Sequence, residues 1–275
     1  MRCPIIAICL LLALPQLAQA TKRGAERKAA AKRFELRVEE QGWNGARRAD
    51  LEAVFNSACS EIAVHFEGNE KLGLEPIRVR HDKSGPIVLF QRSLRGELIV
   101  ELSSSGTYWS QHAYQIAHEF CHILCRFKEG DRSNLWFEES LCELASIYAI
   151  RQMSKTWQTD PPYPNWKSYA KSLKGYAEDV VGKYPLPDGK QFSTWFKEAH
   201  AQLRTKPTQR ELNGIIAVHL LPIFEEHPNA WQTLPYLNIG RTKEPQKFRD
   251  YLRAWHNNTP TKLRPLVAKI TQQFE

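Results

Sequence analysis

The sequence predicts an α+β protein, with a mixed strand and helix N-terminal lobe followed by a mainly helical C-terminal lobe. Up to about residue 105, short β-type runs alternate with a single helical segment, whereas helical spacing of apolar residues dominates afterwards. Of the 275 residues, 42% are hydrophobic and eight are tryptophan. A chain of this length and composition can bury a sizeable core.

The N-terminal lobe is expected to begin with a strand and a helix. Residues 33–40, RFELRVEE, alternate apolar and polar side chains, and residues 46–66 repeat apolar residues at helical spacing. Three β-type runs follow at residues 77–80, 86–92 and 97–102, separated by the turn sequences HDKSG and SLRG. These three runs are therefore expected to form a meander or hairpins.

Helices are expected over the rest of the chain. The segment SSSGTYWS, residues 103–110, offers several N-caps for a helix that ends near residue 128, and a second helix is expected over residues 135–153. The loop TDPPYPNW follows. The remaining segments with helical spacing are residues 166–184, 191–203, 210–227, 230–237, 245–255 and 263–274.

The first twenty residues have the layout of a secretory signal peptide. Arg2 precedes an apolar run that ends in Ala-Gln-Ala, so cleavage is expected after Ala20. A membrane anchor is the alternative, but the run contains two prolines and is shorter than the ~20 apolar residues of a spanning helix. The protein is therefore expected to be secreted or periplasmic, without a stable membrane anchor after cleavage.

The net charge of +8 is concentrated in part in residues 21–33, TKRGAERKAAAKR. No aromatic residues interleave with these basic ones, so the run is interpreted as a solvated basic leader, and no nucleic-acid partner is expected. The expected α/β lobe with the metal site then covers residues 34–154, and the expected helical lobe covers residues 155–275.

A candidate metal site lies in residues 114–127, YQIAHEFCHILCRF, where His118 and His122 flank Glu119. Each residue of a helix turns by ~100°, so these two imidazoles lie ~40° apart on one face and can reach one ion. His-Glu-x-x-His is a zinc signature for this reason. Glu119 lies ~100° round the helix, where it can touch a metal-bound water without being a ligand.

A third ligand is expected on the next helix. The segment NLWFEESLCELASIY, residues 134–148, carries Glu138, Glu139 and Glu143 among residues typical of a buried helix. Buried carboxylates usually have a partner, and a dication held by two imidazoles is such a partner. Glu139 and Glu143 lie one turn apart, which suits one ligand and one acceptor for a histidine N–H.

The pair of motifs HEFCH, residues 118–122, and WFEES, residues 136–140, resembles the gluzincin zinc metallopeptidases. Over about residues 97–150, the resemblance implies a gluzincin-like fold that binds one zinc ion per chain. It implies that the ligands are His118, His122 and Glu139, that Glu119 is the general base, and that Glu143 holds the first histidine. Glu138 and Glu143 remain the rival positions for the third ligand.

The resemblance also implies where a substrate binds. Members of the group lay an extended substrate along an edge strand beside the zinc, and the segment ELIVELSSSG, residues 97–106, is expected to be that edge. Ser140 stands where the aminopeptidases of the group have glycine, and no segment for binding a free amino terminus is found. Aminopeptidase activity is therefore not expected.

The expected function is that of an exported zinc-dependent hydrolase, a peptidase in which Glu119 activates a zinc-bound water to cleave a peptide or protein substrate. Two alternatives stay open: a secreted metal-binding or scaffold protein of the same fold without turnover, and a zinc amidase acting on a non-protein amide. A further donor should stabilise the oxyanion. Its candidates are Tyr108, His112, Tyr148, Tyr163, Tyr169, His219 and His227.

Four cysteines follow the expected signal peptide: Cys59, Cys121, Cys125 and Cys142. An oxidising compartment would allow one or two disulfides. If the two metal helices pack side by side, Cys142 can bridge to Cys121 or to Cys125, with Cys59 free or paired with the remaining cysteine. Cys125 turns to within ~20° of His118 but is interpreted as a packing or disulfide residue rather than as a ligand.

Overall fold

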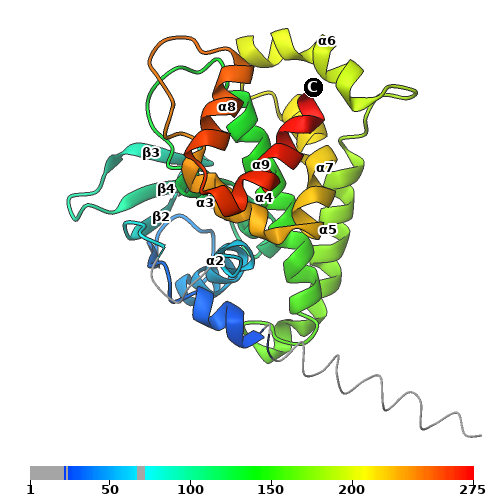
Figure 1. Cartoon of the computed structure of the whole chain (residues 1–275). Coiled ribbons are helices and arrows are strands. Elements are labelled where there is room, and N and C mark those ends of the chain that lie inside the picture. Colours follow the sequence, from blue (N-terminus) through cyan, green and yellow to red (C-terminus); the bar gives the residue numbers. More distant parts are fainter. Residues whose placement is uncertain (1–21, 23, 67–71) are drawn as a thin grey trace, which may run out of the picture.

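The computed structural model describes residue 22, residues 24–66 and residues 72–275 (Figure 1). The expected signal peptide at residues 1–20 lies outside the described residues. The described chain is mixed α/β, with one small sheet and many helices. Within these residues, no helix combines the length and the apolar character that crossing a membrane requires.

Four strands form the sheet, in the order β1-β2-β4-β3. β1 pairs with β2 and β2 pairs with β4 in parallel, whereas β3 is antiparallel to β4. The expected strands are therefore confirmed, and β3 and β4 form one of the expected hairpins. The expected meander is wrong for β2, which pairs with β4 and not with β3. The strands are β1, Leu36–Val38; β2, Ile77–His81; β3, Ile87–Arg92; and β4, Leu98–Leu102.

The burial of β3 and β4 explains this order. Every residue of β4 is buried, so this strand occupies an inner position, whereas most side chains of β3 are exposed. The expectation that residues 97–106 supply the edge strand is therefore wrong, because β4 has a neighbour on both sides. The edge on this side of the sheet belongs to β3.

Helix α2, Arg48–Ala63, connects the parallel strands β1 and β2 and packs against α3. Residues 24–30, which precede β1, are helical. The expectation of a solvated basic leader is wrong for Arg27, because its guanidinium is buried and lies 3.3 Å from Glu61 and 3.2 Å from Asp160. Buried cations need such partners, and these carboxylates are distant in sequence.

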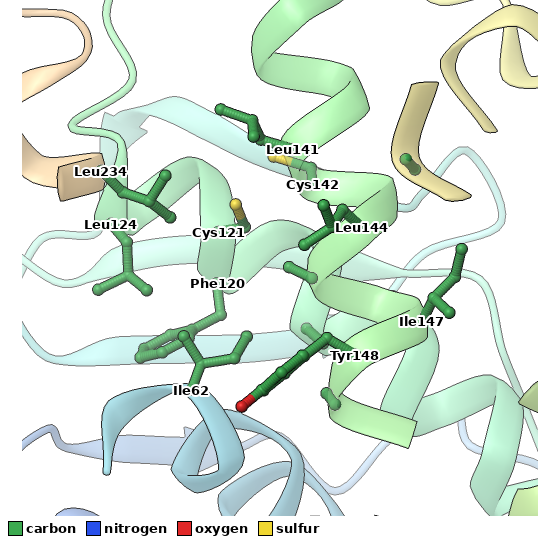
Figure 2. Packing of buried hydrophobic residues seen from close by; sticks show 14 of the residues in the cluster. Ile62, Phe120, Cys121, Leu124, Leu141, Cys142, Leu144, Ile147, Tyr148 and Leu234 are labelled. Atoms are coloured by element: carbon green, nitrogen blue, oxygen red, sulfur yellow. The ribbon is translucent and has the colours of Figure 1, made fainter. Parts of the chain in front are cut away.

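Helices α3, Trp109–Leu124, and α4, Leu135–Thr156, form the centre of the molecule. In Figure 2, Phe120, Cys121 and Leu124 of α3 gather with Leu141, Cys142 and Leu144 of α4 in one buried layer. The four cysteines are buried free thiols, so neither of the expected bridges to Cys142 is formed. They belong to the hydrophobic cluster, as the packing interpretation requires.

The C-terminal helices cover α4, which packs on both α5 and α7 (Figure 1). The Trp136 ring at the start of α4 lies 4.6 Å, centroid to centroid, from that of Phe248. One hydrophobic cluster extends from the sheet to the C-terminal helices. The expected helical segments are confirmed as α5, Ala170–Gly182; α6, Phe192–Thr205; α7, Arg210–Glu226; α8, Phe248–Asn258; α9, Arg264–Thr271; and the 3₁₀ segments Pro164–Tyr169, Pro228–Tyr236, Thr261–Leu263 and Gln272–Phe274.

Candidate metal centre

The packing of α3 against α4 brings two histidines and one carboxylate together. His118 and His122 lie one turn apart on α3, with ring centroids 5.2 Å apart. The Oε2 atom of Glu139 on α4 lies 3.4 Å from Nε2 of His118 and 3.8 Å from Nε2 of His122. The three residues expected to be ligands thus converge on one point.

A second carboxylate faces the other nitrogen of each imidazole. Nδ1 of His118 lies 3.7 Å from Oε2 of Glu143, and Nδ1 of His122 lies 2.7 Å from Oε1 of Glu138. An Nδ1–H that donates to a carboxylate leaves the Nε2 lone pair available for a metal ion. Glu143 therefore lies where the sequence predicts an acceptor for His118, and Glu138, a rival position for the third ligand, instead contacts His122.

These outer carboxylates are held in turn by residues from other elements. Oε2 of Glu138 accepts a hydrogen bond of 2.9 Å from Asn238 and lies 3.5 Å from the guanidinium of Arg241. The Tyr114 hydroxyl donates to Glu143 from one turn before His118 on α3. Sequence reasoning missed all three of these partners, although Tyr114 could have been found from its spacing to His118.

The electrostatics favour an ionised Glu139. Burial raises the pKa of this carboxyl, but hydrogen bonds and charges from His118 and His122 outweigh burial, so its pKa is lowered. Burial lowers the pKa of His122, yet its bonds to Glu138 and Glu139 leave that pKa raised well above the ordinary value. In this arrangement protons compete with a metal ion for the imidazole nitrogens, so metal affinity should fall in acid.

Glu119 is buried beside this group, and desolvation raises the pKa of its carboxyl. The neighbouring charges of His118 and His122 oppose that shift, and so does a hydrogen bond from the backbone of Val88 in β3. The carboxylate therefore lies between the two histidines and the edge strand.

A cleft of about 660 Å³ opens over these residues. Ile87, Val88 and Phe90 of β3 line one wall, and Tyr176 of α5 and Arg210 of α7 contribute to the lining from the helical part of the chain. A volume of this order is typical of ligand sites. The cleft therefore gives an extended ligand access to the group formed by His118, His122, Glu119 and Glu139.

The oxyanion-stabilising candidates from the sequence lie elsewhere. None of the seven residues Tyr108, His112, Tyr148, Tyr163, Tyr169, His219 and His227 lines this cleft in the described structure. The tyrosines that do line it are Tyr114 and Tyr176. Burial raises the pKa of the Tyr176 phenol, with a further contribution from Glu143, so this hydroxyl stays a donor at neutral pH.

Cys142 is a second candidate for the third metal ligand, besides Glu139. Sγ of Cys142 and one ring nitrogen each of His118 and His122 lie within 4.8 Å of one another. Cys142 is fully buried, and desolvation raises its pKa well above the ordinary value, whereas a thiol binds metal as the thiolate. The lowered pKa of Glu139 favours its ionised form, and its Oε2 faces both Nε2 atoms, so His118, His122 and Glu139 fit a dication better.

Comparisons of the chain with protein-family models, with curated proteins and with solved structures found no match. The resemblance to gluzincins therefore rests on the two sequence motifs. Because a fold does not define a function by itself, the geometry of the residues around the cleft is what indicates the function of this chain.

Proposed function

We propose that the protein is a zinc-dependent hydrolase, and that its substrates are peptides or proteins. The observation that carries this proposal is the position of one Glu139 oxygen, 3.4 Å and 3.8 Å from the Nε2 atoms of His118 and His122. Two imidazoles and one carboxylate form a ligand set known from catalytic zinc sites, which keep one position open. When bound, zinc would lower the pKa of a water molecule and polarise a substrate carbonyl.

Glu119 supplies the proton transfer in this proposal. Its carboxylate takes a proton from the attacking water and then delivers that proton to the nitrogen of the leaving amine. Burial raises the pKa of Glu119, which brings it closer to the neutral range in which a general base and acid works best. The Val88 backbone contributes a smaller effect that lowers this pKa, consistent with a carboxylate beside the edge strand.

Tyr176 is the proposed donor to the carbonyl oxygen that gains charge during the reaction. Its phenol is in the cleft lining, and its raised pKa keeps the proton on the oxygen. Tyr114 has a different role, because its hydroxyl donates a hydrogen bond to Glu143. We assign Tyr114 to positioning Glu143 and, through it, the imidazole of His118.

Strand β3 supplies the proposed contact with the substrate backbone. It is an edge strand, and its Ile87 and Phe90 are 45% and 55% exposed. An extended peptide can add to such an edge through main-chain hydrogen bonds. This arrangement favours a peptide over a compact non-protein amide, although the zinc amidase and the non-catalytic binding protein stay as alternative outcomes of the test.

Export remains a prediction from residues 1–20.

The test measures metal content and turnover in the same preparations. Wild-type protein, reconstituted with zinc and dialysed, should retain about one zinc per chain and cleave members of a peptide library, as followed by mass spectrometry. Glu119→Gln should retain the zinc and lose cleavage. The control is Glu178→Gln, which changes a carboxylate that is 65% exposed on α5 and should behave as wild type.

Three outcomes separate the alternatives. Non-protein amides are assayed in the same preparations, and their cleavage without cleavage of any peptide would support the amidase. Zinc retention without cleavage of either class, in wild type and Glu119→Gln alike, would support the binding or scaffold protein. Failure to retain zinc after reconstitution would contradict the proposal itself.

A further inference from the structure

The cleft lining carries positive charge that the metal centre does not use. Lys128 and Arg132, from the loop between α3 and α4, and Arg210, at the start of α7, belong to this lining. Within the part of the chain that the structure describes, none of these three side chains forms a salt bridge or a side-chain hydrogen bond. Apart from Glu129, the acidic residues of the cleft lining belong to the metal centre. The cleft therefore offers unpaired cations to a ligand.

Among these three cations, Arg210 is the one whose charge acts on tyrosines beside the metal centre. It is the first residue of α7, and its charge acts on the phenols of Tyr114 and Tyr176. Those phenols flank Glu143, which contacts His118. Arg210 therefore lines the same part of the cleft as Tyr114 and Tyr176, beside the metal centre.

Asn213, one turn after Arg210 on α7, adds a second and independent observation. It is 3% exposed and contributes to the cleft lining. Its Nδ2 donates to the Trp136 carbonyl at 2.8 Å and to Ser140 Oγ at 3.1 Å. Because a carbonyl can only accept, these bonds fix which end of the amide is oxygen.

The oxygen of that amide is left without a partner. Oδ1 of Asn213 is buried and accepts no hydrogen bond from the described residues. Leaving a buried acceptor unsatisfied is unfavourable, and an N–H group of a bound ligand would satisfy it. Residues three apart on a helix are neighbours, so a ligand at Arg210 can also reach Asn213.

We propose that Arg210 and Asn213 form a subsite for a carboxylate-bearing residue of the substrate, an inference that rests on the proposed hydrolase function. The guanidinium of Arg210 binds the carboxylate through paired N–H donors, and Oδ1 of Asn213 accepts the backbone N–H. A C-terminal residue presents both groups together, since its α-carboxylate is attached to the same carbon as its amide nitrogen. An internal Asp or Glu side chain offers the same carboxylate.

The experiment uses zinc-loaded full-length protein and two matched pairs of peptides. The first pair differs only in a free carboxylate or an amide at the C-terminus, and the second carries Glu or Gln as the last residue of an amidated peptide. The wild-type kcat/KM should favour the carboxylate member of at least one pair by about tenfold or more. Preference within the first pair assigns the α-carboxylate as the source, and preference within the second assigns the side chain.

Variants of Arg210 then test whether this residue causes the preference for the carboxylate peptides. Arg210→Met should bring the preferred ratio close to one, and Arg210→Lys should restore part of it, because the charge returns without the paired donors. Arg253→Met is the matched control, since Arg253 is 61% exposed on α8, pairs with Asp250 and is not among the residues that line the cleft. It should keep the wild-type ratio.

A binding measurement separates this inference from the hydrolase proposal. Fluorescence anisotropy with labelled versions of the same peptides reports affinity for zinc-loaded Glu119→Gln protein, with and without Arg210→Met. Tighter binding of the carboxylate peptides that Arg210→Met abolishes would support the subsite even if no peptide is ever cleaved. Cleavage and binding that ignore the carboxylate in both pairs would overturn the subsite and leave the hydrolase proposal standing.

Discussion

The Nδ1 atom of His122 lies 2.7 Å from Oε1 of Glu138, and both side chains are buried. Glu138 and Glu139 are adjacent on α4, and successive residues on a helix point ~100° apart. The two carboxylates consequently approach the same imidazole from different sides, Glu138 at Nδ1 and Glu139 at Nε2. In the proposed metal site, Glu138 orients the ring, and Glu139 binds the ion together with Nε2 of His122.

Exchanging each carboxylate for an amide should distinguish the proposed ligand, Glu139, from the residue that orients His122, Glu138. Glu139→Gln removes the charged donor at the Nε2 atoms and should cause the larger loss of zinc affinity. Glu138→Gln should cost about 10- to 100-fold, as expected when a partner of a ligating histidine is changed. Zinc affinity is measured by competition with a chromophoric chelator, and circular dichroism confirms that each variant is folded.

The reverse order of these two losses would contradict the assignment. If Glu138→Gln lost more affinity than Glu139→Gln, Glu138 would be the third ligand. The interpretation of Arg241 would then also change, because its guanidinium lies 3.5 Å from Glu138 and would compete with the ion.

Removing the hydroxyl of Tyr176 should slow turnover while leaving the metal in place. The loss of one donor to a developing oxyanion typically lowers kcat by about 10²- to 10³-fold, and the KM of Tyr176→Phe should change little. Steady-state kinetics on one cleaved peptide measures both quantities. Tyr108→Phe is the control, because Tyr108 is 71% exposed and is absent from the cleft lining. Equal rates for wild type and Tyr176→Phe would exclude Tyr176 as the donor.

His112 should make the fold sensitive to mild acid. Its buried ring lies 2.9 Å from the Gly106 carbonyl at Nε2 and 2.8 Å from Ser104 Oγ at Nδ1, an arrangement that suits the neutral tautomer with a proton on Nε2. Desolvation lowers the pKa of His112 in the folded state. The unfolded state therefore binds the proton more readily, so this contribution to stability is lost as pH falls below the unfolded value of ~6.5.

Urea denaturation at pH 7.5 and 5.5 measures this effect. Wild-type protein should lose more unfolding free energy between the two pH values than His112→Gln does. Using the difference between the two proteins removes the contributions of the other histidines, which both share. An identical loss in both proteins would show that His112 does not titrate between the two states.

The central helices could be predicted from local sequence, but the pairing of strands could not. α3 and α4 carry apolar residues at helical spacing, and both begin where the sequence predicts a helix. The runs IVLFQR and LIVEL are both apolar enough for a central strand. Which one is central depends on the parallel pairing of β2 with β4, and this is a non-local contact.

The candidate site, too, could be predicted from local sequence only in part. Helical spacing alone places His118, Glu119 and His122, and it limits the third donor to three glutamates. Which of Glu138 and Glu139 faces the Nε2 atoms depends on how α4 lies against α3. It also depends on Asn238 and Arg241, which contact Glu138 from about a hundred residues later in the chain. Tyr176 reaches the cleft from α5, and no local pattern in the sequence indicates that position.

X-ray absorption spectroscopy at the zinc edge, on reconstituted and dialysed protein, tests the assigned ligand set most directly. With His118, His122 and Glu139 as ligands, the first shell should contain only nitrogen and oxygen at about 2.0–2.2 Å, with the outer scattering of imidazole. A sulfur shell at about 2.3 Å would contradict this set and assign Cys142 as the third donor. Protein that retains no zinc would contradict the metal centre as a whole.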